Sequence, residues 1–328
     1  MSFTIKNIQG IEGDDLLYHL SLLGYNINDI PNRYFFFPLN NHYNTHLDNW
    51  ITEAKKKAED AEVVVFYDLV NIDDMEHINF CKFITNFNHK CKVYLTVNQS
   101  LNLQLYDVKI IHWDFMWNRT KSYYTEIIPE NLYLHHYAGP NAYRLPKLNF
   151  NNKSIKFLSL CGREFGYRTH LYNLVKEYQG YISNRSLNIY LESTEVTGVF
   201  HPIPNNFYLD SCLSVYVESN WLHSDLIHIT EKTFEPLIKG HFILPFSNPG
   251  IINRILKLGF KLTNFINYDY DNIINTEVRF EMYRKEFLRL MDMDLNKFYI
   301  QHKDMLLHNQ RCINTIPYDT NILEIFDV

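Results

Sequence analysis

Basic residues follow two of the chain's apolar, strand-like runs, in the segments SLCGREFGYR (159–168) and VESNWLHSDLIHITEKTFEP (217–236). The first segment contributes Arg163 and Arg168, and the second contributes Lys232. In doubly wound α/β sheets, ligands bind where the strands end. Arginine and lysine placed there can pair with phosphate oxygens through charge-assisted hydrogen bonds. The pattern therefore indicates a site for a phosphorylated ligand.

Lys232 falls in the first turn of a helix that we expect over residues 229–240. The exposed N–H groups and the positive end of the helix dipole favour an anion, and the lysine ammonium adds to both. Glu231 is placed to accept hydrogen bonds from ribose hydroxyls, as acidic residues do in other nucleotide sites. The alternative is that both residues are only solvated side chains of a first turn.

The segment SNWLHSDLIHITEKTFEPLIKGHFILPF (219–246) resembles the donor-binding motif of α1,3-fucosyltransferases. Both have a polar S-N stretch, a T-E-K triplet that opens a helix, a small-residue turn and an apolar strand. IKFLSLCGREFGYRTHLYNLV (155–175) is similar to the arginine-bearing loop and following helix of that family. The chain is also similar to glycosyltransferase-like proteins of phages, in which segments like WNRTKSYY (117–124) of this chain occur as well. The fucosyltransferase likeness does not extend to the first half of the chain.

The resemblance implies a GT-B fold, an α/β architecture in which two Rossmann-like domains face a central cleft. It also implies a glycosyltransferase that moves a sugar from a nucleoside-diphosphate sugar to an acceptor hydroxyl. We expect the reaction to be inverting and metal-independent, with no cofactor besides the nucleotide sugar as co-substrate. The expected donor-binding residues lie in the two segments quoted above: Arg163, Arg168, Ser219, Asn220, Thr230, Glu231, Lys232 and Thr233.

Within this donor site, the resemblance implies diphosphate contacts from Arg163 and Lys232 and a ribose contact from Glu231. Positive groups are needed there because a departing diphosphate gains charge in the transition state. The chain departs from the family pattern at Thr233 and Phe234 with Pro236, and IKGHFIL replaces an alanine-rich A-G-x-x-P turn. The identity of the sugar is therefore not carried over.

An inverting transfer needs a carboxylate or histidine that removes the proton of the acceptor hydroxyl. Asp114 is our first candidate, because it directly follows the strand-like run that ends at Trp113. Asp68 ends another such run, and Glu12 and Asp14 are further candidates. Helix capping or turn formation is the alternative role for each. Polar residues close to Asp114 are the expected acceptor contacts: Asn118, Arg119 and Lys121.

β-branched and aromatic runs alternate with helix-like segments along the chain, which argues for parallel βαβ units. Strands are expected at 61–70, 92–97, 108–113, 155–161, 212–220 and 241–247. Helices are expected at 74–87, 169–178, 229–240, 248–260 and within 275–314. Pro236 conflicts with a regular helix that starts at Thr230, so either the first turn is irregular or the helix starts near the proline.

The stretch AGPNAYRLPKLNFNNKS (138–154) has prolines, asparagines and no sustained helical or strand period, which indicates a linker. We therefore expect an acceptor-binding Rossmann-like domain over residues 1–150. A nucleotide-sugar-binding Rossmann-like domain is expected over 151–328, with C-terminal helices that are candidates to pack back on the first domain.

Two D-x-D motifs, at 269–271 and 292–294, are the sequence's candidates for a divalent metal site. Both lie late in the chain, and Asp294 also suits the cap of a helix that begins near Leu295. We therefore expect no metal site.

The composition excludes several classes of protein. The net charge of −6 and a pI near 6.2 give no support to general binding of nucleic acid or anionic membrane. No apolar run reaches the roughly 18 residues that a membrane span needs, and the N-terminus lacks a signal-peptide core, so we expect a cytoplasmic protein. Five cysteines without a C-x-x-C pair indicate reduced thiols rather than a zinc site.

The acceptor stays open between a glycan, a small molecule and a hydroxymethylated base of viral DNA. The rival from another class is a noncatalytic nucleotide- or sugar-binding module, because a fold alone does not secure an activity.

Overall fold

The structure is a computed structural model, in which the chain forms two compact units. One unit comprises Met1–Arg119 with Tyr318–Val328, and the other comprises Thr120–Pro317. Among the residues that the structure describes, each unit holds a four-stranded parallel sheet, so the α/β class with Rossmann-like units is confirmed. The structure describes the following residues: 11–25, 34–38, 56, 58, 61–68, 84, 87–96, 107–125, 144–161, 166–184, 204–218 and 227–327.

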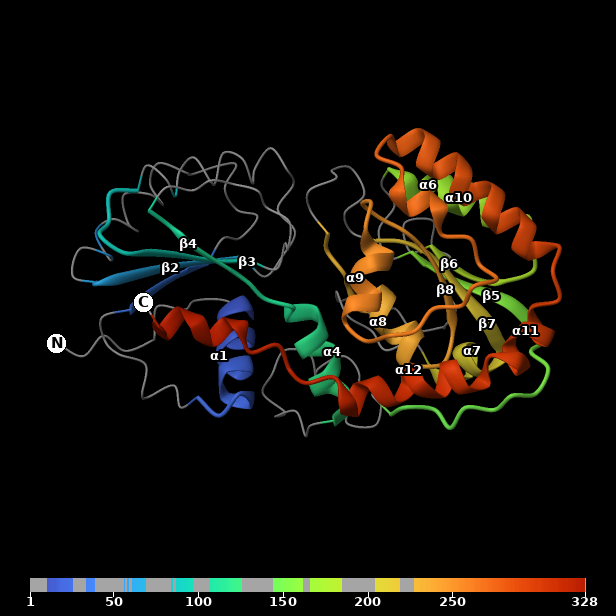
Figure 1. The fold of residues 1–328 in the computed structure, drawn as a ribbon, viewed down its shortest axis with the longest axis horizontal. Helices are drawn as coiled ribbons and strands as arrows, with labels where there is room; N and C mark the ends of the chain where they lie inside the picture. The colour runs from blue at the N-terminus through green and yellow to red at the C-terminus, as the bar shows by residue number, and fades with distance from the viewer. Residues whose placement is uncertain are drawn as a thin grey trace. The chain divides into compact units, whose positions relative to one another are not determined.

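The first unit is built on a sheet whose strands lie in chain order, β1-β2-β3-β4 (Figure 1). Its β-branched and aromatic residues suit strands that are buried on both faces. The side chains of Val64, Phe66 and Tyr94 are fully buried in one apolar cluster of this sheet. Its elements are α1 (Ile11–Leu22), β1 (Tyr34–Pro38), β2 (Val63–Asp68), β3 (Lys92–Thr96), β4 (Lys109–His112) and the start of α4 (Phe115–Thr125).

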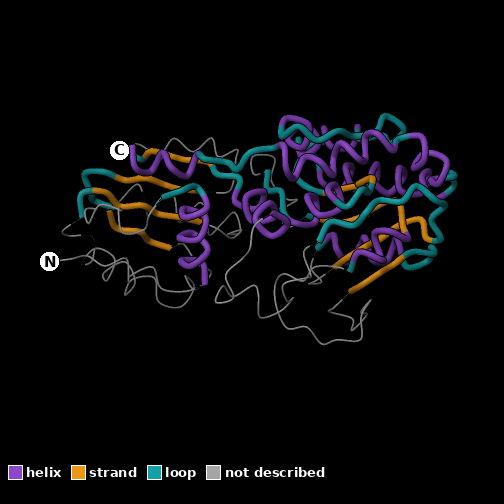
Figure 2. The backbone as a smooth tube through the Cα atoms, turned by 90° about the horizontal axis from the view of Figure 1, so that it is seen from below, coloured by secondary structure: helices purple, strands orange, loops and turns teal. Residues whose placement is uncertain are grey.

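The last residues of the chain complete the first unit beside β4, as Figure 2 shows. The short 3-10 helix η5 (Asn321–Asp327) contacts β4 through side-chain hydrogen bonds. The amide of Asn321 donates to the carbonyl of His112 at 3.1 Å. The ammonium of Lys109 donates to the carbonyl of Glu324 at 2.9 Å. The C-terminal segment therefore returns to the first unit.

The second unit has the strand order β6-β5-β7-β8, and all four strands are parallel. The strand β7 is buried along its whole length. The strands and the helices around them are β5 (Ile155–Cys161), α6 (Tyr167–Val175), β6 (Tyr181–Asn184), α7 (Asn205–Asp210), β7 (Ser211–Val217), α8 (Glu231–Ile238), β8 (Phe242–Phe246) and α9 (Ile251–Lys257). The C-terminal part adds η4 (Asp269–Asn272), α10 (Thr276–Met291), α11 (Leu295–Gln301) and α12 (Lys303–Thr315).

The two faces of the second sheet carry different chemistry. One face is apolar, where Phe157 and Leu213 pack with Phe287 of α10 in the main core. The opposite face of β7 is polar, because Ser214 and Tyr216 make hydrogen bonds to His241 and to α8. In Figure 1, α6 and α10 lie on one side of this sheet, and α7 and α8 lie on the other.

The boundary between the two units differs from the one predicted between residues 150 and 151. The division lies within α4 and again after Pro317. The second half of α4 belongs to the second unit because Lys121 donates a hydrogen bond to the carbonyl of Ile313 at 2.6 Å. The segment just before residue 150 also belongs to the second unit, because the side-chain amide of Gln310 donates to the carbonyl of Pro146 at 2.9 Å.

The helix α8 resolves the conflict over Pro236 in favour of an irregular first turn. The amides of Thr233 and Phe234 both donate to the carbonyl of Thr230, at 3.1 and 3.2 Å. The helix ends as predicted at Gly240, whose φ of 79° suits a glycine in the C′ position. Among the described helices, none is both long enough and apolar enough to cross a lipid bilayer.

Candidate functional site

The second sheet has a topological switch point between β5 and β7, since the chain continues to β6 on one side and to β7 on the other. At the carboxyl edge, Cys161 pairs with Asn184. The pairing of Leu158 with Ser214 brings Val217 level with Cys161. The segments that leave β5 and β7 therefore start side by side, at the place where doubly wound sheets bind ligands.

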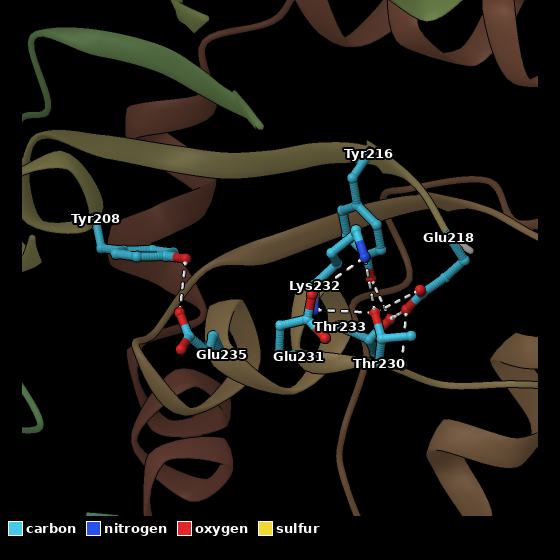
Figure 3. A network of polar contacts seen from close by, with 8 residues as sticks. All are labelled: Tyr208, Tyr216, Glu218, Thr230, Glu231, Lys232, Thr233 and Glu235. Carbon is cyan, nitrogen blue, oxygen red and sulfur yellow. Dashed lines mark hydrogen bonds and ion pairs between the residues drawn. The ribbon is translucent and has the colours of Figure 1, made fainter. Parts of the chain in front are cut away.

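Glu218, the residue that follows β7, lies at the centre of a hydrogen-bond network there (Figure 3). Its Oε1 accepts from the amide of Thr230 at 3.1 Å and from the hydroxyl of Thr233 at 2.6 Å. Its Oε2 accepts from the hydroxyl of Thr230 at 2.6 Å. The side chain is fully buried, so these donors and the N-terminus of α8 compensate its charge.

Tyr216 extends the network along β7. Its hydroxyl donates to the hydroxyl of Thr233 at 2.8 Å, and that hydroxyl in turn donates to Glu218. Burial raises the pKa of Tyr216 well above its ordinary value, with the negative charge of Glu218 as a second cause. The phenol therefore stays protonated and acts as a donor. These contacts tie the first turn of α8 to the end of β7.

Lys232 and Glu231 occupy the outer side of the same turn. The ammonium of Lys232 lies 3.1 Å from Oε1 of Glu231 and 3.3 Å from the hydroxyl of Thr230. The backbone amide of Lys232 donates to that hydroxyl at 3.3 Å, which makes Thr230 the N-cap of α8. Both charged side chains are partly exposed, at 20% for Lys232 and 29% for Glu231.

The structure thus divides the four predicted donor-binding residues of this turn into two pairs. Thr230 and Thr233 are buried and face Glu218, so they hold the turn in place. Glu231 and Lys232 are the pair that a ligand can reach from solvent. Chemically, the turn offers one ammonium, one carboxylate and the positive end of a helix dipole.

His228 lies just before this turn and is almost completely buried. Burial lowers its pKa to about 4, and the positive charge of Lys232 acts in the same direction. The imidazole is therefore neutral at physiological pH and can serve as a hydrogen-bond donor or acceptor. This histidine was not among the predicted site residues.

Glu218 was also missed from the sequence. A signal was available, because Glu218 is an acidic residue that directly follows a fully buried strand, and acidic side chains are rarely buried. Its partners Thr230 and Thr233 lie too far along the chain for any local period to connect them.

The segment after β5 is described from Gly166 onward. Gly166 is the N-cap of α6, with φ 52° and ψ −128°, a conformation that favours glycine. It has no side chain with which to cap the helix. Arg168 lies in the first turn of α6 and is buried. The other predicted donor-binding residues lie outside the described residues: Arg163, Ser219 and Asn220.

A second polar cluster lies between α8 and α7. Glu235 and Lys239 form an ion pair at 3.4 Å, and the hydroxyl of Tyr208 donates to Glu235 at 3.4 Å (Figure 3). The ammonium of Lys239 also lies 4.5 Å from the centre of the Tyr208 ring. Burial raises the pKa of Glu235 and lowers that of Lys239. This cluster is closed to solvent and stabilises the packing of α8.

Both predicted catalytic residues lie at the carboxyl edge of the sheet in the first unit. Asp68 is the last residue of β2, and its side chain lies outside the described part of the structure. Asp114 comes two positions after β4, and its backbone amide donates to a carboxylate oxygen of Asp319 at 2.7 Å. Asp114 is partly exposed. A catalytic role for either residue stays a prediction.

The three predicted acceptor contacts are buried. Asn118 exchanges hydrogen bonds with the backbone of Asp319, at 2.8 and 2.6 Å. Lys121 donates to the carbonyl of Ile313 at 2.6 Å. Burial lowers the pKa of His19 to about 3, and the positive charge of Arg119 acts in the same direction. The contacts of Asn118 and Lys121 fasten C-terminal backbone onto α4.

The two D-x-D motifs both cap helices. A carboxylate oxygen of Asp271 accepts from the amides of Gly250 and Ile252, at 3.1 and 3.0 Å, at the start of α9. Asp294 accepts from the amide of Lys297 at 3.3 Å at the start of α11, as the sequence indicated. In the described part of the chain, no group of three or more histidine, cysteine or acidic side chains is arranged to hold a metal ion.

The chain matches no protein-family model, and no curated protein matches it. The resemblance to α1,3-fucosyltransferases thus depends on the motif residues alone.

Proposed function

We propose that this chain is a glycosyltransferase that uses a nucleoside-diphosphate sugar and binds this donor at the carboxyl edge of the second sheet. The observation that carries the proposal is the position of Lys232, at the N-terminus of α8 and beside the switch point between β5 and β7. A lysine at a helix N-terminus next to a switch point has the chemistry that a diphosphate requires.

The network around Glu218 supports this proposal because it makes the turn rigid. Anchored by Thr230 and Thr233, the first turn of α8 does not have to reorganise when a charged ligand arrives. Preorganised charge of this kind is the main means by which enzymes stabilise a leaving group. Glu218 carries a negative charge itself, but three donors hold its carboxylate on the inner side of the turn.

The proposed reaction is a single inverting displacement. The acceptor oxygen attacks the anomeric carbon, the bond from that carbon to the diphosphate oxygen breaks, and a base removes the acceptor proton. Lys232 meets the charge of the departing diphosphate, and the family resemblance adds Arg163 to it. Asp114 and Asp68 are the candidate bases, which makes a GT-B arrangement of the two units part of the proposal.

Isothermal titration calorimetry with GDP, UDP and ADP tests the donor site. Loss of one charge-assisted contact costs about 1.5 to 3 kcal/mol, so Lys232→Ala and Arg163→Ala should each weaken binding about 10- to 100-fold. Lys285→Ala removes an exposed positive charge from α10 and serves as the matched control. The donor site is refuted if the wild-type chain binds none of the three, or if both variants bind like the control.

Release of sugar separates an enzyme from a noncatalytic binding module. We expect the purified chain to hydrolyse a matching nucleotide sugar slowly and to transfer the sugar faster once an acceptor is supplied. Asp114→Asn should keep the nucleotide affinity and lower the turnover number. Tight nucleotide binding with no sugar released under any condition would favour the binding module.

A further inference from the structure

Asn184 is the last residue of β6, and its side chain is completely buried. Neither its amide nitrogen nor its amide oxygen has a hydrogen-bond partner among the residues that the structure describes. Buried side-chain amides in native proteins are nearly always hydrogen-bonded, so such an exception needs a physical explanation. An ordered water and a polar group of a ligand are two such explanations.

The register of the sheet places this amide at the switch point. Asn184 pairs with Cys161, the last residue of β5, so both lie in one row at the carboxyl edge. Paired residues of parallel strands point to the same face. That face is the one covered by α6, since Ile182, two positions earlier on β6, packs against the main apolar core, to which Leu171 of α6 belongs.

The unit β5-α6-β6 has the layout of a mononucleotide-binding βαβ unit. In such units a glycine-containing turn after the first strand opens a helix whose N-terminus takes phosphate. Gly166 opens α6 with a backbone conformation that favours glycine. A side chain at the end of the second strand, about 20 residues further along, then binds the ribose hydroxyls. Asn184 occupies this position.

We propose that the side-chain amide of Asn184 binds a vicinal diol of the nucleotide ligand. The nitrogen donates to one hydroxyl oxygen, and the amide oxygen accepts from the other hydroxyl. An ionised carboxylate could only accept, whereas an amide matches a diol in both directions. Two adjacent hydroxyls occur in the ribose and in many transferred sugars, so the shared chemistry is the diol. This inference rests on the proposed function.

Asn184 lies at a different strand end from the proposed donor contacts on α8. The family resemblance gives the ribose to Glu231, which follows β7, whereas Asn184 ends β6 on the other side of β5. If Glu231 takes the ribose, the diol at Asn184 is that of the transferred sugar. The experiment therefore needs ligands that differ only in these two diols.

Calorimetry on the wild-type chain, Asn184→Leu and Asn184→Ala provides the test. Leucine and asparagine are close in size, and alanine guards against a leucine variant that does not fold. Ser183→Ala, one position earlier on the same strand, is the matched control. The ligands are GDP and UDP, their 2′,3′-dideoxy forms and a sugar nucleotide of each.

For a ribose contact, both Asn184 variants should bind the ribonucleotides about 10-fold more weakly, and the dideoxy forms as the wild type does. For a sugar contact, only the sugar nucleotides should bind about 10-fold more weakly. Either result supports the inference. Affinities within twofold of the wild type for every ligand overturn it.

Lys232→Ala, measured in parallel, separates this inference from the proposed function. If Lys232→Ala weakens nucleotide binding and the Asn184 variants do not, the amide holds a water and only the inference falls. If the wild-type chain binds none of the nucleotides, the inference falls together with the proposed function.

Discussion

Glu218 accepts two hydrogen bonds from Thr230, one from its amide at 3.1 Å and one from its hydroxyl at 2.6 Å. The same hydroxyl accepts from the amide of Lys232, so one threonine connects the buried carboxylate to the first turn of α8. Removing the carboxylate leaves buried donors without an acceptor, which costs more than the hydrogen bonds themselves contribute.

Substitution of Glu218 should therefore lower the free energy of unfolding in a graded way. Glu218→Gln keeps one acceptor oxygen but loses the charge, and we expect a loss of about 1 to 2 kcal/mol. Glu218→Ala leaves the donors of Thr230 and Thr233 unsatisfied, and we expect a loss of about 3 kcal/mol or more. Urea unfolding followed by circular dichroism measures both. Equal losses for the two variants would contradict this account.

Tyr216→Phe isolates the outer end of the same network. It removes only the donor to Thr233, so the expected loss in unfolding free energy is about 1 kcal/mol. In the double variant with Glu218→Gln, the two losses should not add, because both residues contact the hydroxyl of Thr233. Additive losses would show that the hydroxyl of Thr233 does not couple Tyr216 to Glu218.

His241 should make the stability of the second unit depend on pH. Its Nε2 lies 2.8 Å from the carbonyl of Tyr208 and its Nδ1 lies 2.9 Å from the hydroxyl of Ser214. A carbonyl can only accept, so Nε2 carries the proton and Nδ1 accepts from the serine. Burial lowers the pKa of His241 from 6.5 to about 3. The folded protein therefore contains the neutral imidazole of His241.

Between pH 3 and 6.5 the unfolded chain binds more protons than the folded one, so the free energy of unfolding rises with pH. One such histidine contributes a slope of up to about 1.4 kcal/mol per pH unit. Urea unfolding of His241→Gln between pH 4 and 7 should show a slope smaller by about this amount. Ser214→Ala, which keeps the histidine, should retain the wild-type slope. An unchanged slope in His241→Gln would contradict the prediction.

Elements whose signal is local could be predicted from the sequence. The strand expected at 155–161 coincides with β5, because its mostly apolar residues suit a strand whose centre is buried. The end of α8 before Gly240 follows from the chemistry of helix caps, whereas Pro236 left the start of the helix open.

Relationships that depend on tertiary contacts could not be predicted. The hydrogen bonds between Asn118 and Asp319 join residues that are separated by the whole second unit, and no local pattern marks either one. The linker composition around residue 146 was correctly seen as irregular. It did not reveal that Pro146 is bonded to α12, which places this segment in the second unit.

The helix-capping roles of Asp271 and Asp294 lead to a prediction about metals. Because their carboxylates accept backbone amides, we expect nucleotide binding and sugar release to be the same in EDTA as in Mn²⁺. Asp294→Ala should instead lower the unfolding free energy by about 1 kcal/mol through loss of the cap. Activity that is abolished by EDTA and restored by Mn²⁺ would show that a metal ion takes part.

The ion pair between Glu231 and Lys232, at 3.1 Å, means that a diphosphate must compete with a carboxylate for the ammonium. Glu231→Gln removes that competitor, and a partly exposed pair is worth about 0.5 to 1 kcal/mol, so inorganic pyrophosphate should bind roughly two- to fivefold more tightly. A nucleoside diphosphate should respond in the opposite direction if Glu231 accepts from the ribose, because the variant loses a charge-assisted contact. Calorimetry with both ligands on one variant therefore separates the two roles of this carboxylate. Tighter binding of both ligands would leave Glu231 as a partner of Lys232 only and would remove it from the donor site.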